Sequence, residues 1–285
     1  MARGSRWTRE ELLIAFRLYC QIPFGQFHQR NQHMIHYAEA LGRTPSSLAM
    51  KCCNIASLDP AFLATGRQGL SGASLADRAM WDEMTHDWEA FLLASEEAFL
   101  LFGCPLLEEA STEPSVLENV PEEVEESEEP QQDYTGRTRT VTTQARVGQR
   151  FFRRAVLNAY ENRCCITGLQ IPRLLIASHI VPWKENRENR LNPQNGLALS
   201  TLHDAAFDKG MLTINADYTV RISTDIGQPD DQFFQESLQQ FNGREIRLPN
   251  DRFLPDPIFL EYHRDVIFEK WRTLSSHSSN TSFSF

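Results

Sequence analysis

The sequence predicts an α+β protein, with a helical domain followed by a mixed domain, and three observations support this. The first hundred residues place apolar side chains at helical spacing. An acidic, proline-containing stretch then interrupts the pattern. The remaining chain alternates short apolar runs, turn residues and helical segments. We expect a helical domain over 1–107, a linker over 108–136, a mixed domain over 137–274 and a disordered tail over 275–285.

The acidic stretch accounts for the net charge of the whole chain. Residues 108–133 hold eleven acidic and no basic side chains, with three prolines, whereas the formal net charge of the chain is −10. Such a segment buries too little apolar surface to offset its chain entropy, so we expect a disordered linker. Outside it the chain is nearly neutral, and its acidity therefore does not exclude a nucleic-acid partner.

Local signals in the first domain predict helices. Thr8 and Glu11 have the spacing of a capping box, and apolar residues then recur on one face. Gly42 suits a helix C-terminus, and Thr44–Pro45 suits a helix start. We expect helices over 9–22, 31–42 and 44–58, and one long helix or a helix pair over 77–102.

The second domain reads as mixed. We expect a helix over 146–163, then a short strand entering a turn at 164–168. The apolar run 174–183 predicts a strand that ends at Pro182. The remaining segments predict a loop, strand and helix over 191–210 and a hairpin over 211–223.

Composition excludes several classes of protein. No run of eighteen apolar residues exists, and the N-terminus lacks the apolar core of a signal peptide, so we expect a cytoplasmic protein without a membrane partner. The six cysteines include no CxxC spacing, which suits neither a disulfide framework nor a four-cysteine zinc site. We expect reduced, mostly buried thiols and no structural zinc.

Three residues in the second domain suggest chemistry. His179 lies at a predicted strand end, Asn195 follows sixteen residues later, and His203 lies eight beyond that. Phosphodiester hydrolysis needs a base to take a proton from water and a cation to stabilise the charge on phosphate. An imidazole can act as base near neutral pH, and a second imidazole with a carboxylate can hold a divalent metal.

The surrounding string resembles the HNH, or ββα-metal, nucleases. Within that family it is similar to the group with an "HI-P" strand, an "NG-L-L" middle and an "H-FD-G" end, read here at 179–182, 195–199 and 203–210. The upstream segment 146–160 and the Cys165–Gly168 turn resemble the same group. The likeness covers roughly residues 145–225 and implies a ββα-metal nuclease fold.

The resemblance implies a role for each matching residue. His179 would activate the attacking water, Asn195 would hydrogen-bond backbone and orient His179, and His203 would bind the metal. Asp208 would be a second ligand or its neighbour. Many relatives carry Asp or His just before the base, whereas this chain has Ser178. The implied cofactor is Mg²⁺, Mn²⁺ or another divalent ion.

Plainer interpretations stand beside these roles. A single histidine is usually a packed or surface side chain, although the ordered string argues against this for His179. Asn195–Gly196 by itself predicts only a turn. Asp208 suits a helix end or an ion pair equally well.

Basic residues gather near this string. They are candidates for phosphate contacts, since guanidinium groups bind phosphate in bidentate fashion, but an ordinary solvated helix face is an equal alternative for those on the helix. The helix 146–163 and its approach carry Arg137, Arg139, Arg146, Arg150, Arg153 and Arg154, and the loop before Asn195 carries Lys184, Arg187 and Arg190.

Residues 6–58 resemble a Myb/SANT-like three-helix unit, with Trp7–Glu11 at its start and 41–48 leading into the third helix. Such a unit can lay its last helix in a major groove. A packing or protein-interaction module is the alternative. The side chains expected to reach DNA are Arg43, Ser46, Ser47, Lys51 and Asn54.

Together these features predict a divalent-metal-dependent DNA endonuclease, with restriction or antiviral defence as the role suggested by analogy. One alternative is a DNA-binding regulator whose HNH fold is inactive because of Ser178. Another is a nuclease whose first domain binds a protein partner. A single site per chain leaves a homodimer open for double-strand cleavage.

Overall fold

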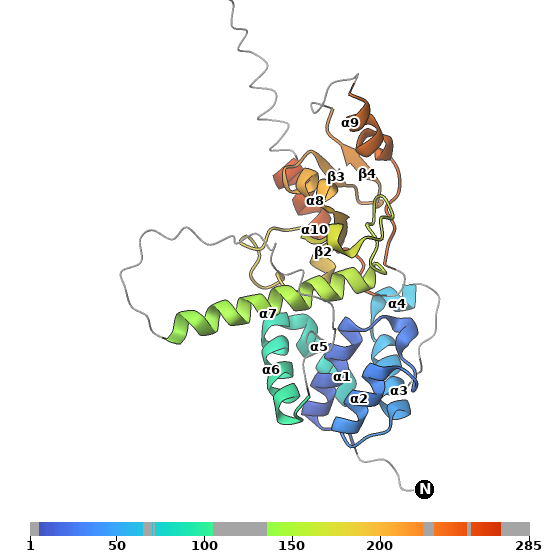
Figure 1. The fold of residues 1–285 in the computed structure, drawn as a ribbon, viewed down its shortest axis with the longest axis vertical. Helices are drawn as coiled ribbons and strands as arrows, with labels where there is room; N and C mark the ends of the chain where they lie inside the picture. Colours follow the sequence, from blue (N-terminus) through green and yellow to red (C-terminus); the bar gives the residue numbers. More distant parts are fainter. Residues whose placement is uncertain are drawn as a thin grey trace, which may run out of the picture.

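The computed structural model describes residues 6–64, 70, 72–104, 136–224, 231–249 and 252–268. A bundle of helices from the first part of the chain lies on one side of the long helix α7 (Gly136–Ala159), and the elements of the second part lie on its other side (Figure 1). Helix α7 contacts α1 as well as the strands β1 and β2. It therefore joins the two halves.

The predicted capping signals are present in the N-terminal helices. Thr8 accepts a hydrogen bond from the backbone of Glu11, whose side chain binds the Thr8 backbone in return, which is the predicted capping box. Asp87 separates the predicted 77–102 segment into a helix pair and caps the second helix. The helices are α1 (Arg9–Gln21), α2 (Gln32–Ala40), α3 (Pro45–Ala56), α4 (Pro60–Ala64), α5 (Leu75–His86) and α6 (Trp88–Leu101), with a short 3-10 turn η1 (Phe24–Gln26).

The second half holds two small antiparallel hairpins among short helices. Its strands are β1 (Leu175–His179), β2 (Gly196–Ser200), β3 (Leu212–Ile214) and β4 (Val220–Ile222). β1 pairs with β2, and β3 pairs with β4, as predicted for the latter hairpin. The helical elements are α8 (Thr201–Asp208), α9 (Gln232–Ser237), α10 (Pro257–Tyr262), a π-helical turn (His263–Phe268) and 3-10 turns at Pro172–Leu174, Pro193–Asn195 and Gln239–Phe241.

The strand predicted at 164–168 is wrong, because this segment is a turn. The Gly168 amide donates back to the Cys164 carbonyl, and Gly168 has a φ of +76°. The Cys165 amide does pair with the Ala198 carbonyl of β2, and the Cys165 carbonyl accepts from the Arg247 amide. These isolated bonds of a single residue inside a turn do not form a strand.

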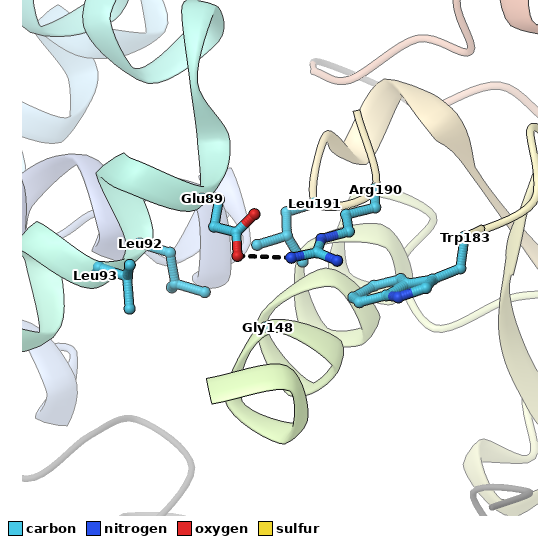
Figure 2. Close-up of a pocket in the computed structure, with 7 residues that line it drawn as sticks. All are labelled: Glu89, Leu92, Leu93, Gly148, Trp183, Arg190 and Leu191. Carbon is cyan, nitrogen blue, oxygen red and sulfur yellow. Dashed lines mark hydrogen bonds and ion pairs between the residues drawn. The ribbon is translucent and has the colours of Figure 1, made fainter. Parts of the chain in front are cut away.

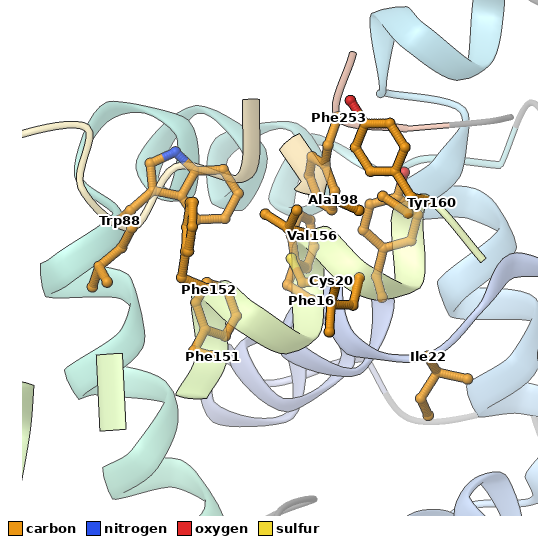
Figure 3. Packing of buried hydrophobic residues seen from close by; sticks show 14 of the residues in the cluster. Phe16, Cys20, Ile22, Trp88, Phe151, Phe152, Val156, Tyr160, Ala198 and Phe253 are labelled. Atoms are coloured by element: carbon orange, nitrogen blue, oxygen red, sulfur yellow. The ribbon is translucent and has the colours of Figure 1, made fainter. Parts of the chain in front are cut away.

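One hydrophobic core runs through both halves. The indole of Trp88 in α6 packs against Phe151 of α7 and Phe253 of the C-terminal segment, with ring centroids 6.1 and 6.0 Å away (Figure 3). Phe16 and Cys20 of α1 are completely buried in the same cluster. The two predicted domains therefore pack on each other.

A buried arginine strengthens this contact. Arg252 is 1% exposed, and its guanidinium donates hydrogen bonds to the main-chain oxygens of Tyr19 and Ile22 at the end of α1. The last carbonyls of a helix have no partners inside the helix, and a cation there is favourable. The C-terminal segment thus caps the first helix.

The predicted linker, 108–136, lies outside the described residues except for Gly136, which is already the first residue of α7. The predicted tail, 275–285, also lies outside them. No helix in the described part combines the length and the apolar character needed to cross a bilayer. All six cysteines lie in the described part as free thiols, and Cys53 alone among them is not buried.

Candidate functional site

The β1–β2 hairpin lies between two helices and carries the candidate base. α7 contacts both strands, and α8 also contacts both. His179 is the last residue of β1 and pairs with Gly196 at the start of β2. Ser200, at the other end of β2, pairs with Leu175.

His179 is held on three sides. Its imidazole stacks on Phe152 of α7, with ring centroids 3.8 Å apart and planes 7° from parallel. The ring of Trp183 meets it edge-on at 5.4 Å. Its Nε2 lies 2.9 Å from the main-chain oxygen of Arg190. These contacts fix both the position and the rotation of the ring.

The Arg190 carbonyl also determines which nitrogen of His179 carries the proton. A carbonyl oxygen can only accept a hydrogen bond, so Nε2 must donate, and a neutral ring then has its lone pair on Nδ1. Burial lowers the pKa of His179 to about 4, with the hydrogen bond to Arg190 opposing this shift. Near neutral pH the ring is therefore uncharged and can accept a proton at Nδ1.

Asn195 ties down the chain that follows His179. Its side-chain oxygen accepts from the Val181 amide at 2.8 Å, and its side-chain nitrogen donates to the Val181 carbonyl at 3.1 Å. The Ile180 amide donates to the Asn195 carbonyl at 2.9 Å. Asn195 is completely buried, so these bonds replace water that it cannot reach. The contacts of Asn195 are those of a residue that holds the backbone next to His179.

Gly196 is required by packing. A Cβ at this position would lie 2.9 Å from Phe152 Cζ and would overlap Val156 of α7. Its backbone is extended, with φ −130°, so no left-handed conformation is involved. The plainer interpretation of Asn195–Gly196 as only a turn does not account for this glycine, because α7 approaches the strand too closely for any side chain at position 196.

His203 is held by a different set of contacts from those of His179. Its Nδ1 lies 2.8 Å from Ser200 Oγ, and its ring meets Phe241 edge-on at 5.5 Å. Its Nε2 is buried near the backbone of Ser237 without a well-aligned hydrogen bond, and burial lowers the pKa of His203.

The strand register shows how far apart the two imidazoles are anchored. His179 pairs with Gly196, whereas Ser200, the partner of His203, lies four residues further along. At a rise of about 3.3 Å per residue, these anchoring points are about 13 Å apart along the hairpin. His179 and His203 are thus anchored at opposite ends of the hairpin, and the pocket that they are predicted to share stays a prediction from the sequence.

Asp204, which was not among the site residues predicted from the sequence, contacts Ser178, the residue next to the candidate base. Burial raises the pKa of the Asp204 carboxyl, and a hydrogen-bond contact from the Ser178 hydroxyl offsets part of that rise. The contact is poorly aligned, because Ser178 Oγ remains a buried polar atom without a well-formed hydrogen bond. The sequence carried one hint of this contact, since many relatives have a metal ligand at the position of Ser178. The sequence alone does not show which side chain of α8 faces that position.

These oxygens suit one kind of cation. Asp204 and Ser178 provide a carboxylate and a hydroxyl, and Asp208 lies one helical turn after Asp204 with an exposed side chain. No group of three or more His, Cys, Asp or Glu side chains able to hold a metal exists in the described part of the chain. Mg²⁺ commonly uses one or two carboxylates and completes its shell with waters and substrate phosphate. The donors fit such an ion and do not fit a closed zinc site.

The basic residues near the hairpin fall into two groups. Arg153 donates to the Leu175 carbonyl at 2.8 Å and thereby secures the start of β1. Arg190 pairs with Glu89 of α6 at 2.6 Å. Lys184 and Arg187 are exposed, and Arg154 is partly exposed beside His33. Lys184 and Arg187 therefore stay predicted phosphate contacts.

The N-terminal cations predicted to reach DNA are engaged inside their own domain. The Arg43 guanidinium binds Glu11 at 2.7 Å and lies over the Trp7 ring, 4.0 Å from its centroid. Lys51 is the one basic residue of α3, and its ammonium binds the buried Asp77 at 2.8 Å.

The remaining predicted contacts in α3 are polar and uncharged. Ser46 is exposed, whereas Ser47 and Asn54 are partly buried. The exposed face of α3 thus carries no cation of its own to meet phosphate. This geometry favours packing over DNA contact for Arg43 and Lys51, because both charges are already paired.

Comparison with known proteins finds a match for the segment that contains the β1–β2 hairpin. Residues 164–215 match a family described as HNH endonuclease, and this span includes β1, β2, α8 and β3. No curated protein matches the chain. HNH domains are generally nucleases, use divalent metal ions and act on DNA. Residues 164–215 are therefore similar to the HNH endonuclease family.

Proposed function

We propose that this protein is a divalent-metal-dependent DNA endonuclease in which His179 is the general base. The observation that carries the proposal is the 2.9 Å hydrogen bond from His179 Nε2 to the Arg190 carbonyl. It leaves the Nδ1 lone pair available in the neutral ring, within a segment that matches HNH endonucleases.

The reaction is the addition of water to a phosphodiester. His179 Nδ1 takes a proton from the water as its oxygen forms a bond to phosphorus. The bond from phosphorus to the 3′ oxygen breaks, the leaving 3′ oxygen takes a proton from solvent water, and the products carry a 5′-phosphate and a 3′-hydroxyl. Phe152 and Asn195 support this step by holding the ring and the following backbone.

The Asp204 carboxylate and the Ser178 hydroxyl are the groups proposed to hold the metal. A divalent cation, when bound, supplies charge neutralisation for the phosphate oxygens. This proposal puts Asp204 and Ser178 in place of His203 in the expected ligand set, because Asp204 contacts the residue next to the base. Asp208 remains a proposed neighbour of the ion.

Lys184 and Arg187 are proposed to contact the DNA backbone. Both are exposed in the loop between His179 and Asn195, at the border of the site. Phosphate contacts of this kind position the duplex and are independent of its sequence. Restriction or antiviral defence would use such an activity, and it stays the proposed biological role.

Supercoiled plasmid tests the proposal. Purified full-length protein should convert it to nicked or linear DNA with Mg²⁺ or Mn²⁺, and a chelator should stop the conversion. Products with 5′-phosphate ends can be rejoined by DNA ligase without prior phosphorylation. Intact plasmid with either ion would contradict the proposal. Accumulation of nicked before linear DNA would indicate one site acting at a time.

A second candidate is a DNA-binding regulator with an inactive HNH fold. The observation that favours it is that the described residues hold no group of three metal-binding acidic, histidine or cysteine side chains. This protein would retard DNA in a gel at low salt without cutting it in the presence of either ion.

A further inference from the structure

The loop between His179 and Asn195 is anchored on the N-terminal bundle. Its residues Trp183, Arg190 and Leu191 line a small pocket with Glu89 and Leu92 of α6 (Figure 2). The pocket lies where α6, α7 and this loop meet. A residue far away in sequence therefore contacts the loop that orients the candidate base.

Arg190 lies at the centre of this arrangement. Its carbonyl accepts the hydrogen bond from His179 Nε2, while its guanidinium binds Glu89 at 2.6 Å. The guanidinium also lies over Trp183, 5.0 Å from the ring centroid, and Trp183 in turn meets His179 edge-on. Both the main chain and the side chain of Arg190 are thus linked to the His179 ring.

The next residue secures the loop by packing. Leu191 is 3% exposed, and a Cβ on Gly148 of α7 would lie only 3.0 Å from its Cδ2 atom. The loop is therefore held by two contacts: Leu191 packs on α7, and Arg190 pairs with Glu89 of α6. Only the contact between Arg190 and Glu89 involves a charge, and Glu89→Gln removes that charge while keeping the shape of the side chain.

We propose that Glu89 is a positioning residue of the nuclease site, which acts through Arg190 to keep His179 Nε2 bound to the Arg190 carbonyl. The N-terminal helical bundle thereby supplies part of the active-site scaffold. This inference rests on the proposed function, since it concerns the same base.

The ion pair is partly exposed, with side-chain exposures of 49% for Glu89 and 24% for Arg190. Pairs of this kind contribute modestly, so its loss should reduce kcat about two- to fivefold and leave the fold intact. If Glu89 merely masked a cation that binds phosphate, its removal would instead lower KM and leave kcat unchanged. The split between kcat and KM separates the two roles.

The test uses full-length Glu89→Gln, Arg190→Gln and the double variant. If Glu89 acts through Arg190, the double variant loses no more kcat than Arg190→Gln alone. Glu83→Gln is the matched control, because Glu83 also forms an ion pair, with Arg9, within the same bundle but away from the loop. It should leave kcat unchanged.

A spectroscopic readout makes the test independent of cleavage. Long-range ¹H–¹⁵N spectra of the imidazoles, with His179 assigned by its loss in His179→Gln, should show the Nε2–H tautomer of His179 in the wild type. Glu89→Gln should mix the two tautomers, and Glu83→Gln should not. Unchanged tautomer and unchanged kcat in Glu89→Gln would overturn the inference.

The two proposals fail in different ways. Absence of plasmid cleavage by the wild type, together with a tautomer change in Glu89→Gln, would remove the nuclease function and leave the positioning contact. Wild-type cleavage that is unaffected by Glu89→Gln would support the nuclease function and overturn the positioning role of Glu89. A lower KM with the same kcat would also overturn positioning, in favour of masking.

Discussion

The imidazole of His179 lies flat against the phenyl ring of Phe152, with centroids 3.8 Å apart. Phe152 belongs to α7, the same helix whose Phe151 packs on Trp88 of the N-terminal bundle. Two adjacent residues of α7 therefore have different partners: Phe152 contacts the candidate base, and Phe151 contacts the N-terminal bundle. α7 is both a wall of the site and the surface that joins the two halves.

Phe152→Leu should reduce cleavage more than stability. Leucine keeps an apolar side chain in a position that is 2% exposed, so we expect a loss of about 1 kcal/mol in the free energy of unfolding. It removes the flat surface that holds the His179 ring, so the cleavage rate should fall at least tenfold. Urea unfolding and plasmid cleavage measure the two effects. Parallel losses that trace entirely to unfolded protein would refute the stacking role.

Gly196→Ala should destabilise the protein. The new methyl group would collide with Phe152 and Val156, and overpacking of this kind costs about 1–3 kcal/mol. Gly25→Ala is the matched control, because a Cβ there meets nothing within 4 Å. Thermal unfolding should separate the two variants clearly, and an equal Tm for both would show that α7 is not so close to β2.

Asp204→Asn should strongly weaken metal-dependent cleavage with little loss of stability. The amide keeps the shape of the carboxyl but loses its charge, and at a partly buried site an uncharged ligand holds a divalent cation weakly. We expect cleavage to fall about 100-fold or more at low Mg²⁺ and to recover in part at high Mg²⁺. Titration of the cleavage rate with Mg²⁺ measures this.

His203→Asn is the companion to that variant. His203 is 3% exposed and pairs with Ser200, so its replacement should lower Tm, while folded protein keeps most of its cleavage. A loss of Mg²⁺ dependence in His203→Asn, with none in Asp204→Asn, would restore the ligand set expected from the sequence.

His263 should make the fold sensitive to acid. It is buried between Thr213 and the Phe207 carbonyl, and burial lowers its pKa to about 4. A folded-state pKa below the unfolded value means that the unfolded chain binds the proton more tightly. Stability should therefore fall as pH drops from about 6.5 to about 4, by up to about 3 kcal/mol from this residue.

Urea unfolding across that pH range checks the His263 prediction. His263→Gln should be less stable than the wild type at neutral pH but should lose less stability on acidification. His28→Gln, at an exposed position, should follow the wild-type curve. An equal slope for His263→Gln and wild type would exclude His263 as a source of the acid sensitivity.

Local signals in the sequence were sufficient for many elements. The Thr8–Glu11 capping box and the β3–β4 hairpin depend on residues a few positions apart, and both are confirmed. The segment 191–210 likewise forms a 3-10 turn, a strand and a helix, as expected. Such features are encoded by short-range spacing.

Contacts between distant segments were not accessible in this way. Arg43 and Lys51 looked like DNA contacts because the sequence does not show that Glu11 and Asp77 pair with them. Asp204 was overlooked because its relation to Ser178 depends on how α8 packs on β1. Arg252, buried against the end of α1, had no local signal at all.

The most direct test of the account compares wild type and His179→Ala in Mg²⁺-dependent plasmid cleavage, with folding of both proteins checked by circular dichroism. General-base catalysis typically contributes about 10²- to 10⁴-fold, so the variant should cleave at least 100-fold more slowly while still binding DNA. Cleavage by folded His179→Ala at the wild-type rate would contradict the assignment of His179 as the base.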